Sequence, residues 1–140
     1  MSDDSGVPSN AELVDVLQRA VGLVRAHFAA GTARLGVTPA EAKVLNQFTE
    51  PMTLKELSTR LGADLSNTAT TVDRLESRGL VRKEIHPGDR RARLLTLTDD
   101  GHALRQKLDA EVFRSVPALE VLDARARREL HDLLKQVVSP

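Results

Sequence analysis

The sequence predicts a mainly α-helical fold that carries one small β-hairpin. Apolar residues recur at helical spacing along most of the chain, whereas the stretch 81–97 alternates with a period of two. Aromatic residues are scarce, with three Phe and neither Trp nor Tyr. A core built from Leu, Val and Ala favours packed helices over an aromatic-rich β-sandwich. The length of 140 residues suits a single domain, 1–140.

The first predicted element is a long helix over residues 11–30. Leu13, Leu17 and Val24 fall on one helical stripe, and Val21 falls on a neighbouring stripe. This apolar surface is wider than the surface helix of a monomer needs. We therefore expect part of it to be covered by a partner chain.

Two short helices with strong N-terminal signals come next. Thr38–Glu41 has the pattern of a capping box with Pro at the first helical position, and the helix it starts should stop before Pro51. Thr53–Glu56 is a second capping box, and Met52 before it is placed to pack on the helix as a hydrophobic staple. Gly62 suits a left-handed C-cap and ends this helix.

A third helix is predicted over residues 66–78. Its N-cap is either Asp64 or Ser66, and Gly79 closes it. Its apolar stripe consists of Ala69, Val72 and Leu75. The remaining surface is short and polar, which is typical of a helix that enters a groove.

The period then changes from helical to alternating. The outgoing strand has Val81, Lys83 and Ile85 on one face, and the returning strand has Leu95 and Leu97 on one face. The turn between them is Pro87-Gly88-Asp89. The sequence therefore predicts a β-hairpin attached directly to the end of a helix.

Two more helices complete the chain. Thr98 caps a helix that continues through Leu108 and Val112, with Pro117 bending or ending it. Asp123 opens a last helix with a Leu- and Val-rich face.

Two short helices joined by a Gly-containing turn and followed by a hairpin form a winged helix-turn-helix arrangement. We assign this DNA-binding lobe to residues 37–98. The flanking segments 11–36 and 99–140 are the expected dimerisation helices. The fold class is thus mainly α with a β-hairpin wing, in which the lobe lies between N- and C-terminal dimerisation helices.

The formal net charge is zero, but basic residues are concentrated in one stretch. Residues 74–93 contain seven Lys and Arg and only three Asp and Glu. A local basic face matters more for DNA binding than the overall charge. The residues predicted to contact DNA lie on the short helices and the wing: Lys55, Ser66, Asn67, Thr68, Thr70, Thr71, Arg74, Arg78, Asp89, Arg90, Arg91 and Arg93.

Three segments in order carry a resemblance to a known family. The string Leu65–Arg82, followed by His86–Arg91 and Leu95–Gly101, resembles the recognition helix, the wing and the wing-to-helix junction of the MarR (multiple antibiotic resistance regulator) family. The resemblance extends over essentially the whole chain. It implies a DNA-binding transcriptional regulator, with repression as the commoner mode in the family.

The resemblance also implies residue roles and partners. Asp89 and Arg91 match the Asp-x-Arg motif of the wing, whose arginine enters the minor groove. Residues 66–74 match the major-groove reader, in which Arg74 is a phosphate contact. Double-stranded DNA, a second copy of the chain in a triangular dimer, and a small-molecule inducer are the implied partners.

The dimer has a physical argument of its own, because apolar faces at both ends of the chain exceed what one small lobe covers. The predicted dimerisation residues are Leu13, Leu17, Val21, Val24, Leu130, Leu133, Leu134 and Val137. For an inducer pocket the candidate lining residues are His27, Phe28 and Phe48, for which a core role is the alternative.

Several function classes are disfavoured by what the sequence lacks. There is no Cys, the four His are scattered, and no catalytic signature occurs, so we expect no metal, no cofactor and no enzyme activity. No apolar run is long enough to span a membrane, and Asp3 and Asp4 make the N-terminus unlike a secretory signal, so a cytoplasmic protein is expected. The open alternative is a winged-helix module for protein contact that does not bind DNA.

Overall fold

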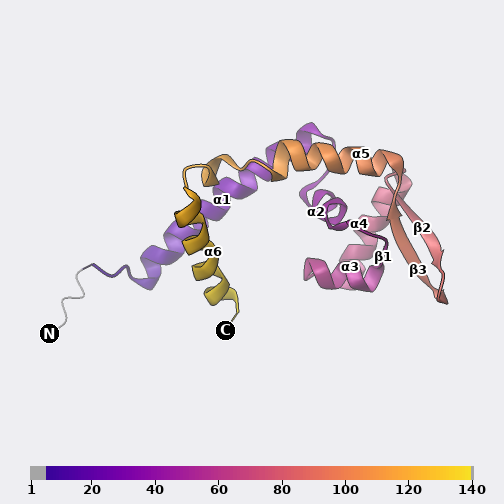
Figure 1. The fold of residues 1–140 in the computed structure, drawn as a ribbon, viewed down its shortest axis with the longest axis horizontal. Helices are drawn as coiled ribbons and strands as arrows, with labels where there is room; N and C mark the ends of the chain where they lie inside the picture. Colours follow the sequence, from indigo (N-terminus) through magenta and orange to yellow (C-terminus); the bar gives the residue numbers. More distant parts are fainter. Residues whose placement is uncertain (1–5, 140) are drawn as a thin grey trace. The chain divides into compact units, whose positions relative to one another are not determined.

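The computed structural model describes residues 6–139; Asp3 and Asp4, used above to argue against a secretory signal, lie outside this range. Figure 1 shows a mainly helical chain with a small antiparallel sheet. The predicted fold class, mainly α with a β-hairpin, is confirmed. The helices are α1 (Asn10–Arg34), α2 (Pro39–Gln47), α3 (Leu54–Leu61), α4 (Leu65–Ser77), α5 (Asp99–Leu108) and α6 (Ala124–Val138). The strands are β1 (Met52–Thr53), β2 (Val81–His86) and β3 (Asp89–Leu97).

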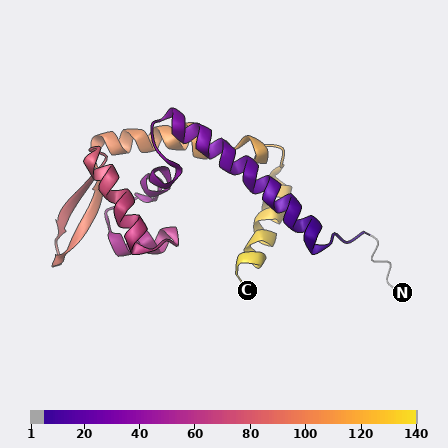
Figure 2. The ribbon, with the colours of Figure 1, turned by 180° about the vertical axis from the view of Figure 1, so that it is seen from behind.

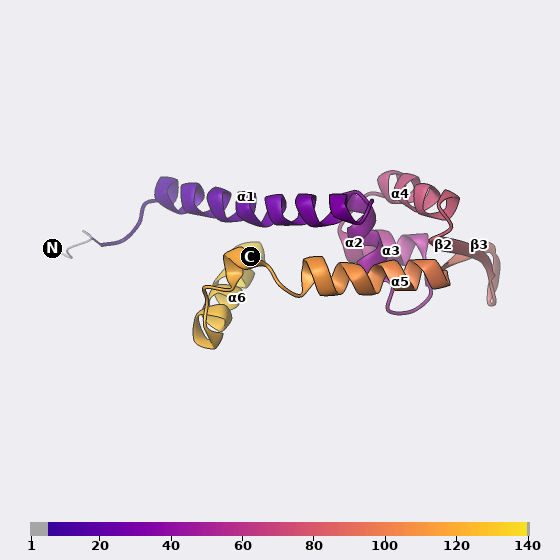
Figure 3. The same cartoon turned by 90° about the horizontal axis from the view of Figure 1, so that it is seen from above.

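The chain divides into two compact units. The central unit consists of Phe28–Arg114, and the terminal unit consists of Met1–His27 together with Ser115–Pro140. Helix α1 is one continuous helix (Figure 3) that contributes residues to both units. The assignment of 1–140 to a single domain with a lobe at 37–98 stays a prediction.

The central unit contains a three-stranded sheet in the order β1-β3-β2. β2 pairs antiparallel with β3 from Val81↔Leu97 onward, with an irregularity between Ile85 and His86. β1 adds a short antiparallel partner on the other edge of β3, where Met52 lies opposite Leu95. The sequence analysis missed β1, because two residues are too few to show an alternating pattern and their pairing is set by β3.

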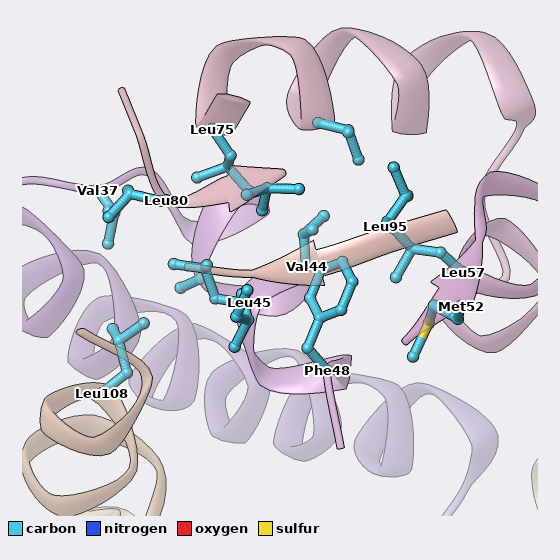
Figure 4. Close-up of a cluster of buried hydrophobic side chains, with 14 of the residues drawn as sticks. Val37, Val44, Leu45, Phe48, Met52, Leu57, Leu75, Leu80, Leu95 and Leu108 are labelled. Atoms are coloured by element: carbon cyan, nitrogen blue, oxygen red, sulfur yellow. The ribbon is translucent and has the colours of Figure 1, made fainter. Parts of the chain in front are cut away.

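Helices and sheet of the central unit share one aliphatic core, shown in Figure 4. Leu45, Leu57, Leu75 and Leu95 from four different elements are all essentially inaccessible to solvent. Phe48 is buried among them. Burial of such side chains contributes about 1.5–3 kcal/mol each, so this core is the main source of stability for the unit.

The helix predicted to continue through Val112 does so, but it changes from α-helical to π-helical hydrogen bonding on the way. α5 ends at Leu108, and a π-helical turn, Asp109–Phe113, follows it. Val116 is extended at φ −121°, and Pro117 opens a short 3₁₀ helix that ends at Leu119. The residue before a proline is driven out of the α region, which explains why Val116 leaves the helix.

The junction from β3 to α5 is tightly packed around Gly101. Thr98 caps α5 by accepting the Gly101 N–H at 3.1 Å, and its own hydroxyl donates to the Gly79 carbonyl at 2.6 Å. A Cβ on Gly101 would lie only 2.1 Å from the Leu80 carbonyl oxygen. This closeness fixes α5 against the end of α4.

Gly101→Ala should therefore lower the free energy of unfolding by about 1–3 kcal/mol, because the backbone must shift to admit the methyl group. Urea denaturation measures the change. The control is His102→Ala at the exposed neighbouring position, which should stay within about 0.5 kcal/mol of the parent. Equal stability of Gly101→Ala and the parent would show that the junction is not tight.

Candidate nucleic-acid interface

The α3–α4 pair is a helix-turn-helix whose ends are set by local hydrogen bonds. Thr53 and Glu56 form both bonds of a capping box at the start of α3. Gly62 ends α3 in the left-handed region at φ +61°, a conformation that glycine adopts without strain. Asp64, not Ser66, is the N-cap of α4, since its Oδ1 accepts the Asn67 N–H at 2.8 Å.

One face of α4 is packed into the core. Thr68, Val72 and Leu75 are buried there, at the i, i+4, i+7 spacing of a helical stripe. The expectation that Thr68 belongs to the exposed face is wrong: its side chain is 2% exposed, and its hydroxyl donates to the Asp64 carbonyl at 2.9 Å. This burial determines which residues α4 presents to solvent.

The opposite face of α4 is polar, and three of its side chains already have partners within the chain. Thr70 donates its hydroxyl to the Ser66 carbonyl at 3.0 Å, and Thr71 donates to the Asn67 carbonyl at 3.1 Å. The Asn67 Nδ2 donates to Asp64 Oδ2 at 2.7 Å. Ser66, Asn67 and Thr70 are exposed and Thr71 is partly exposed. Since the Thr70 and Thr71 hydroxyls are bonded to the backbone of their own helix, the surface that these residues expose includes carbon atoms as well as polar atoms.

The wing carries exposed arginines on an ordered turn. Arg90, Arg91 and Arg93 are all exposed at the start of β3, and the far end of the hairpin projects away from the helices of its unit (Figures 1 and 3). Asp89 Oδ1 accepts the Arg91 N–H at 2.9 Å. Asp89 thus fixes the backbone of the turn, and the Arg91 guanidinium projects from that fixed point.

Lys83 joins the wing to the reader helix, a connection that the sequence analysis missed. Figure 2 shows β2 beside α4. Lys83 Nζ on β2 lies 2.5 Å from Asp73 Oδ1 and 3.7 Å from Glu76 Oε1, both on α4. The hydrogen bond to Asp73 raises the pKa of Lys83 above its ordinary value, and the charge of Glu76 adds to this effect. The single positive charge of the lysine offsets part of the negative charge of these two carboxylates, which would oppose the approach of a phosphate backbone.

Arg78, predicted as a DNA contact, forms an ion pair with another residue of the chain. Its Nη1 lies 2.7 Å from Glu41 Oε2 on α2. The Glu41 side chain is 7% exposed and the Arg78 side chain is 41% exposed. Thr38 accepts the Glu41 N–H as predicted for a capping box, but the Glu41 carboxylate pairs with Arg78. The pair ties the end of α4 to the start of α2.

Of the residues predicted to line an inducer pocket, His27 and Phe28 are neighbours on α1, and Phe48 directly follows α2. Phe28 packs against Phe113, with ring centroids 5.6 Å apart, and Phe48 is in the core and borders a cavity of about 130 Å³. His27 belongs to the terminal unit. A more polar cavity of about 320 Å³ in the central unit is lined by Asn46, Arg105, Gln106, Asp109 and Arg114.

The terminal unit presents an apolar surface. Of the predicted dimerisation residues, Val24 is partly exposed, and the others are exposed: Leu13, Leu17, Val21, Leu130, Leu133, Leu134 and Val137. No helix within residues 6–139 combines the length and the apolar character needed to cross a membrane.

Comparison with known proteins links this geometry to one family. The MarR family model matches residues 47–92, which include α3, α4 and most of the hairpin. A mutant MarR from E. coli, solved in complex with operator DNA, is 26% identical with a TM-score of 0.80, and the match covers 100% of this chain and 99% of that chain.

Two further structures are similar over nearly their whole length. CouR from Rhodococcus jostii, bound to p-coumaroyl-CoA, is 26% identical with a TM-score of 0.77, and the match covers 92% of this chain and 93% of that chain. AbsC, a MarR family transcriptional regulator from Streptomyces coelicolor, shares the fold at 22% identity with a TM-score of 0.83 and 94% coverage of both chains. The family match covers the helix-turn-helix and most of the wing, and the structural similarity to MarR, with its bound operator DNA, and to MarR family transcriptional regulators extends along the whole chain.

Proposed function

We propose that this protein is a cytoplasmic repressor that binds a pseudo-palindromic operator as a homodimer. One observation supports the proposal most strongly: the same unit contains two features that suit DNA binding. The first is a capped helix, α4, whose outer face carries small residues, and the second is a projecting wing with three exposed arginines. A module used only for protein contact would need neither feature. In this proposal the whole chain, 1–140, acts as one domain with its DNA-binding lobe at 37–98.

We assign a different groove to each element. α4 enters the major groove, where its N-terminal residues meet base edges. Arg91 enters the minor groove, where the negative potential favours a guanidinium, and Asp89 positions it. Asp89, which positions the wing, and Arg78, which pairs with Glu41, are set apart. The proposed DNA contacts are the other exposed or partly exposed members of the predicted set: Lys55, Ser66, Asn67, Thr70, Thr71, Arg74, Arg90, Arg91 and Arg93.

The homodimer is proposed from the terminal unit. Its exposed leucines and valines, such as Leu17 and Leu133, would form an apolar patch that is unusual on a monomer. A two-fold partner offers the same face and covers it. Two reading heads related in this way bind half-sites centred about 10–10.5 base pairs apart, or roughly 34–36 Å.

A small-molecule ligand is proposed as the signal that releases DNA. CouR, at 26% identity, has been solved with p-coumaroyl-CoA bound, which supports ligand binding by a protein of this fold. His27, Phe28 and Phe48 remain the proposed lining residues. Such a ligand releases DNA only if it binds more tightly to a state in which the reading heads are wrongly spaced.

The wing is tested with Arg91→Ala on an operator obtained by unbiased selection from a random DNA pool. The variant should bind more weakly to specific and scrambled duplexes alike, and its plot of log affinity against log salt should lose about one unit of slope. The matched control is Lys107→Ala, which removes one exposed charge from α5 and should leave the slope unchanged. An unchanged affinity and slope for Arg91→Ala would favour the protein-contact alternative.

Arg78→Ala should behave differently from the wing variant. Loss of the guanidinium leaves the buried Glu41 carboxylate without its partner, so the free energy of unfolding should fall by about 1–2 kcal/mol, a value reduced because Arg78 is partly exposed. Urea denaturation measures this loss, with Arg74→Ala at an exposed site as the control. A stable Arg78→Ala whose salt slope falls by a full unit would make Arg78 a direct phosphate contact.

Sedimentation at low micromolar concentration tests the dimer. The parent should sediment as a dimer, and Leu133→Glu should weaken the dimer on the order of tenfold or more, because it would bury an unpaired charge. Ile85→Glu introduces the same charge at an exposed wing position and should leave the dimer intact. A well-folded parent monomer at this concentration would refute the proposal.

A further inference from the structure

The hydroxyl groups of Thr70 and Thr71 on the outer face of α4 are already used within the helix. Thr70 donates to the Ser66 carbonyl four residues earlier, at 3.0 Å. In threonine the hydroxyl and the methyl share Cβ, so a hydroxyl held against the backbone leaves the methyl directed away from that carbonyl. Because Thr70 is exposed, this methyl is available to a partner.

A second apolar group lies at the start of the same helix. Leu65 is the first residue of α4, and its side chain is 51% exposed although the core of the unit lies directly beneath the helix. The N-terminal turn of a recognition helix is the part that meets base edges. Leu65 and Thr70 therefore offer carbon where a reader helix usually offers hydrogen-bond donors.

Asn67, the side chain of α4 best suited to polar readout, has a partner in the N-cap residue of its own helix. An asparagine reads adenine by donating and accepting at the same time. Here the Asn67 Nδ2 donates to Asp64 Oδ2 at 2.7 Å, and the same carboxylate caps the helix through the Asn67 N–H at 2.8 Å. Readout by Asn67 would therefore have to work with its Nδ2 held at Asp64 or give up that bond, whereas apolar contact by Leu65 and Thr70 breaks no bond within the helix.

We infer that α4 recognises its operator largely through thymine 5-methyl groups in the major groove, with Leu65 and the γ-methyl of Thr70 as the specificity-determining contacts. The thymine methyl is the one apolar group that the major groove presents, and it distinguishes T from C, A and G without a hydrogen bond. This inference rests on the proposed docking of α4 in the major groove and names the chemistry that it reads there.

The test uses the selected operator with each thymine replaced in turn by deoxyuridine, which removes the methyl and keeps every base-pairing group. The parent should lose about fourfold in affinity per contacted methyl, at one or two positions in each half-site. Leu65→Ala should abolish the loss at one of these positions. Ile85→Ala, an exposed apolar residue on β2, is the matched control and should keep the full pattern of the parent.

Two variants separate the methyl of Thr70 from its hydroxyl. Thr70→Val keeps the methyl and should retain both the affinity and the deoxyuridine pattern. Thr70→Ser keeps the hydroxyl and should lose the sensitivity at one position. Each comparison is a double-mutant cycle, so any general effect of deoxyuridine on the duplex cancels. Circular dichroism confirms that the variants fold.

The opposite result, with Thr70→Ser like the parent and Thr70→Val impaired, would assign the readout to the hydroxyl and overturn the inference. A parent that binds its operator specifically but ignores every thymine methyl would also overturn it, while leaving operator binding itself intact. If selection yields no specific sequence at all, the proposed function fails, and the inference fails with it.

Discussion

The packing of one face of α4 into the core of the central unit is the constraint on which the rest of the interface depends. Thr68, Val72 and Leu75 are buried at helical spacing. Since their burial fixes the rotation of the helix about its axis, it also fixes the outer face from Ser66 to Arg74. Asp64 and Gly79 then set where the helix begins and ends. A helix that reads bases needs a fixed rotation and fixed ends, because turning it about its axis by one residue position would present a different set of side chains to the groove.

Two ion pairs also fix α4 relative to the neighbouring elements of its unit. Lys83 joins β2 to α4 through Asp73, and Arg78 joins α4 to α2 through Glu41. An exposed pair contributes little stability, about 0–1 kcal/mol, so we do not expect the Lys83 contact to hold the fold together. Its effect lies in orientation and charge: it holds the base of the wing beside α4 and offsets part of the acidic charge on that helix.

Much of the fold could be predicted from the sequence because its signals are local. The capping residues Thr38, Thr53 and Thr98 each accept the expected backbone N–H, and the alternating stretch after Gly79 forms the hairpin. What could not be predicted depends on partners distant in sequence. The strand β1 exists only because β3 lies beside it, and the pairing of Glu41 with Arg78 joins residues 37 positions apart.

The polar face of α4 illustrates a second limit. Composition alone predicted hydroxyls and amides directed at bases, and it could not indicate that Thr70 and Asn67 bond within their own helix. It also placed Thr68 on the outer face, although position 68 shares the stripe of Val72. A helical wheel anchored on the buried residues would have identified Thr68 as inward-facing.

The most direct test of the account uses the absence of cysteine from the chain. Ser66→Cys and Arg90→Cys each provide a unique thiol for a DNA-cleaving iron chelate, placed on the reader helix and on the wing respectively. With the selected operator, the Ser66 label should cleave within each half-site and the Arg90 label should cleave the flanking minor groove, in patterns related by two-fold symmetry. Cleavage at the same base pairs from both labels, or a pattern without a dyad, would contradict the central claim that the two elements read separate grooves of a symmetric operator.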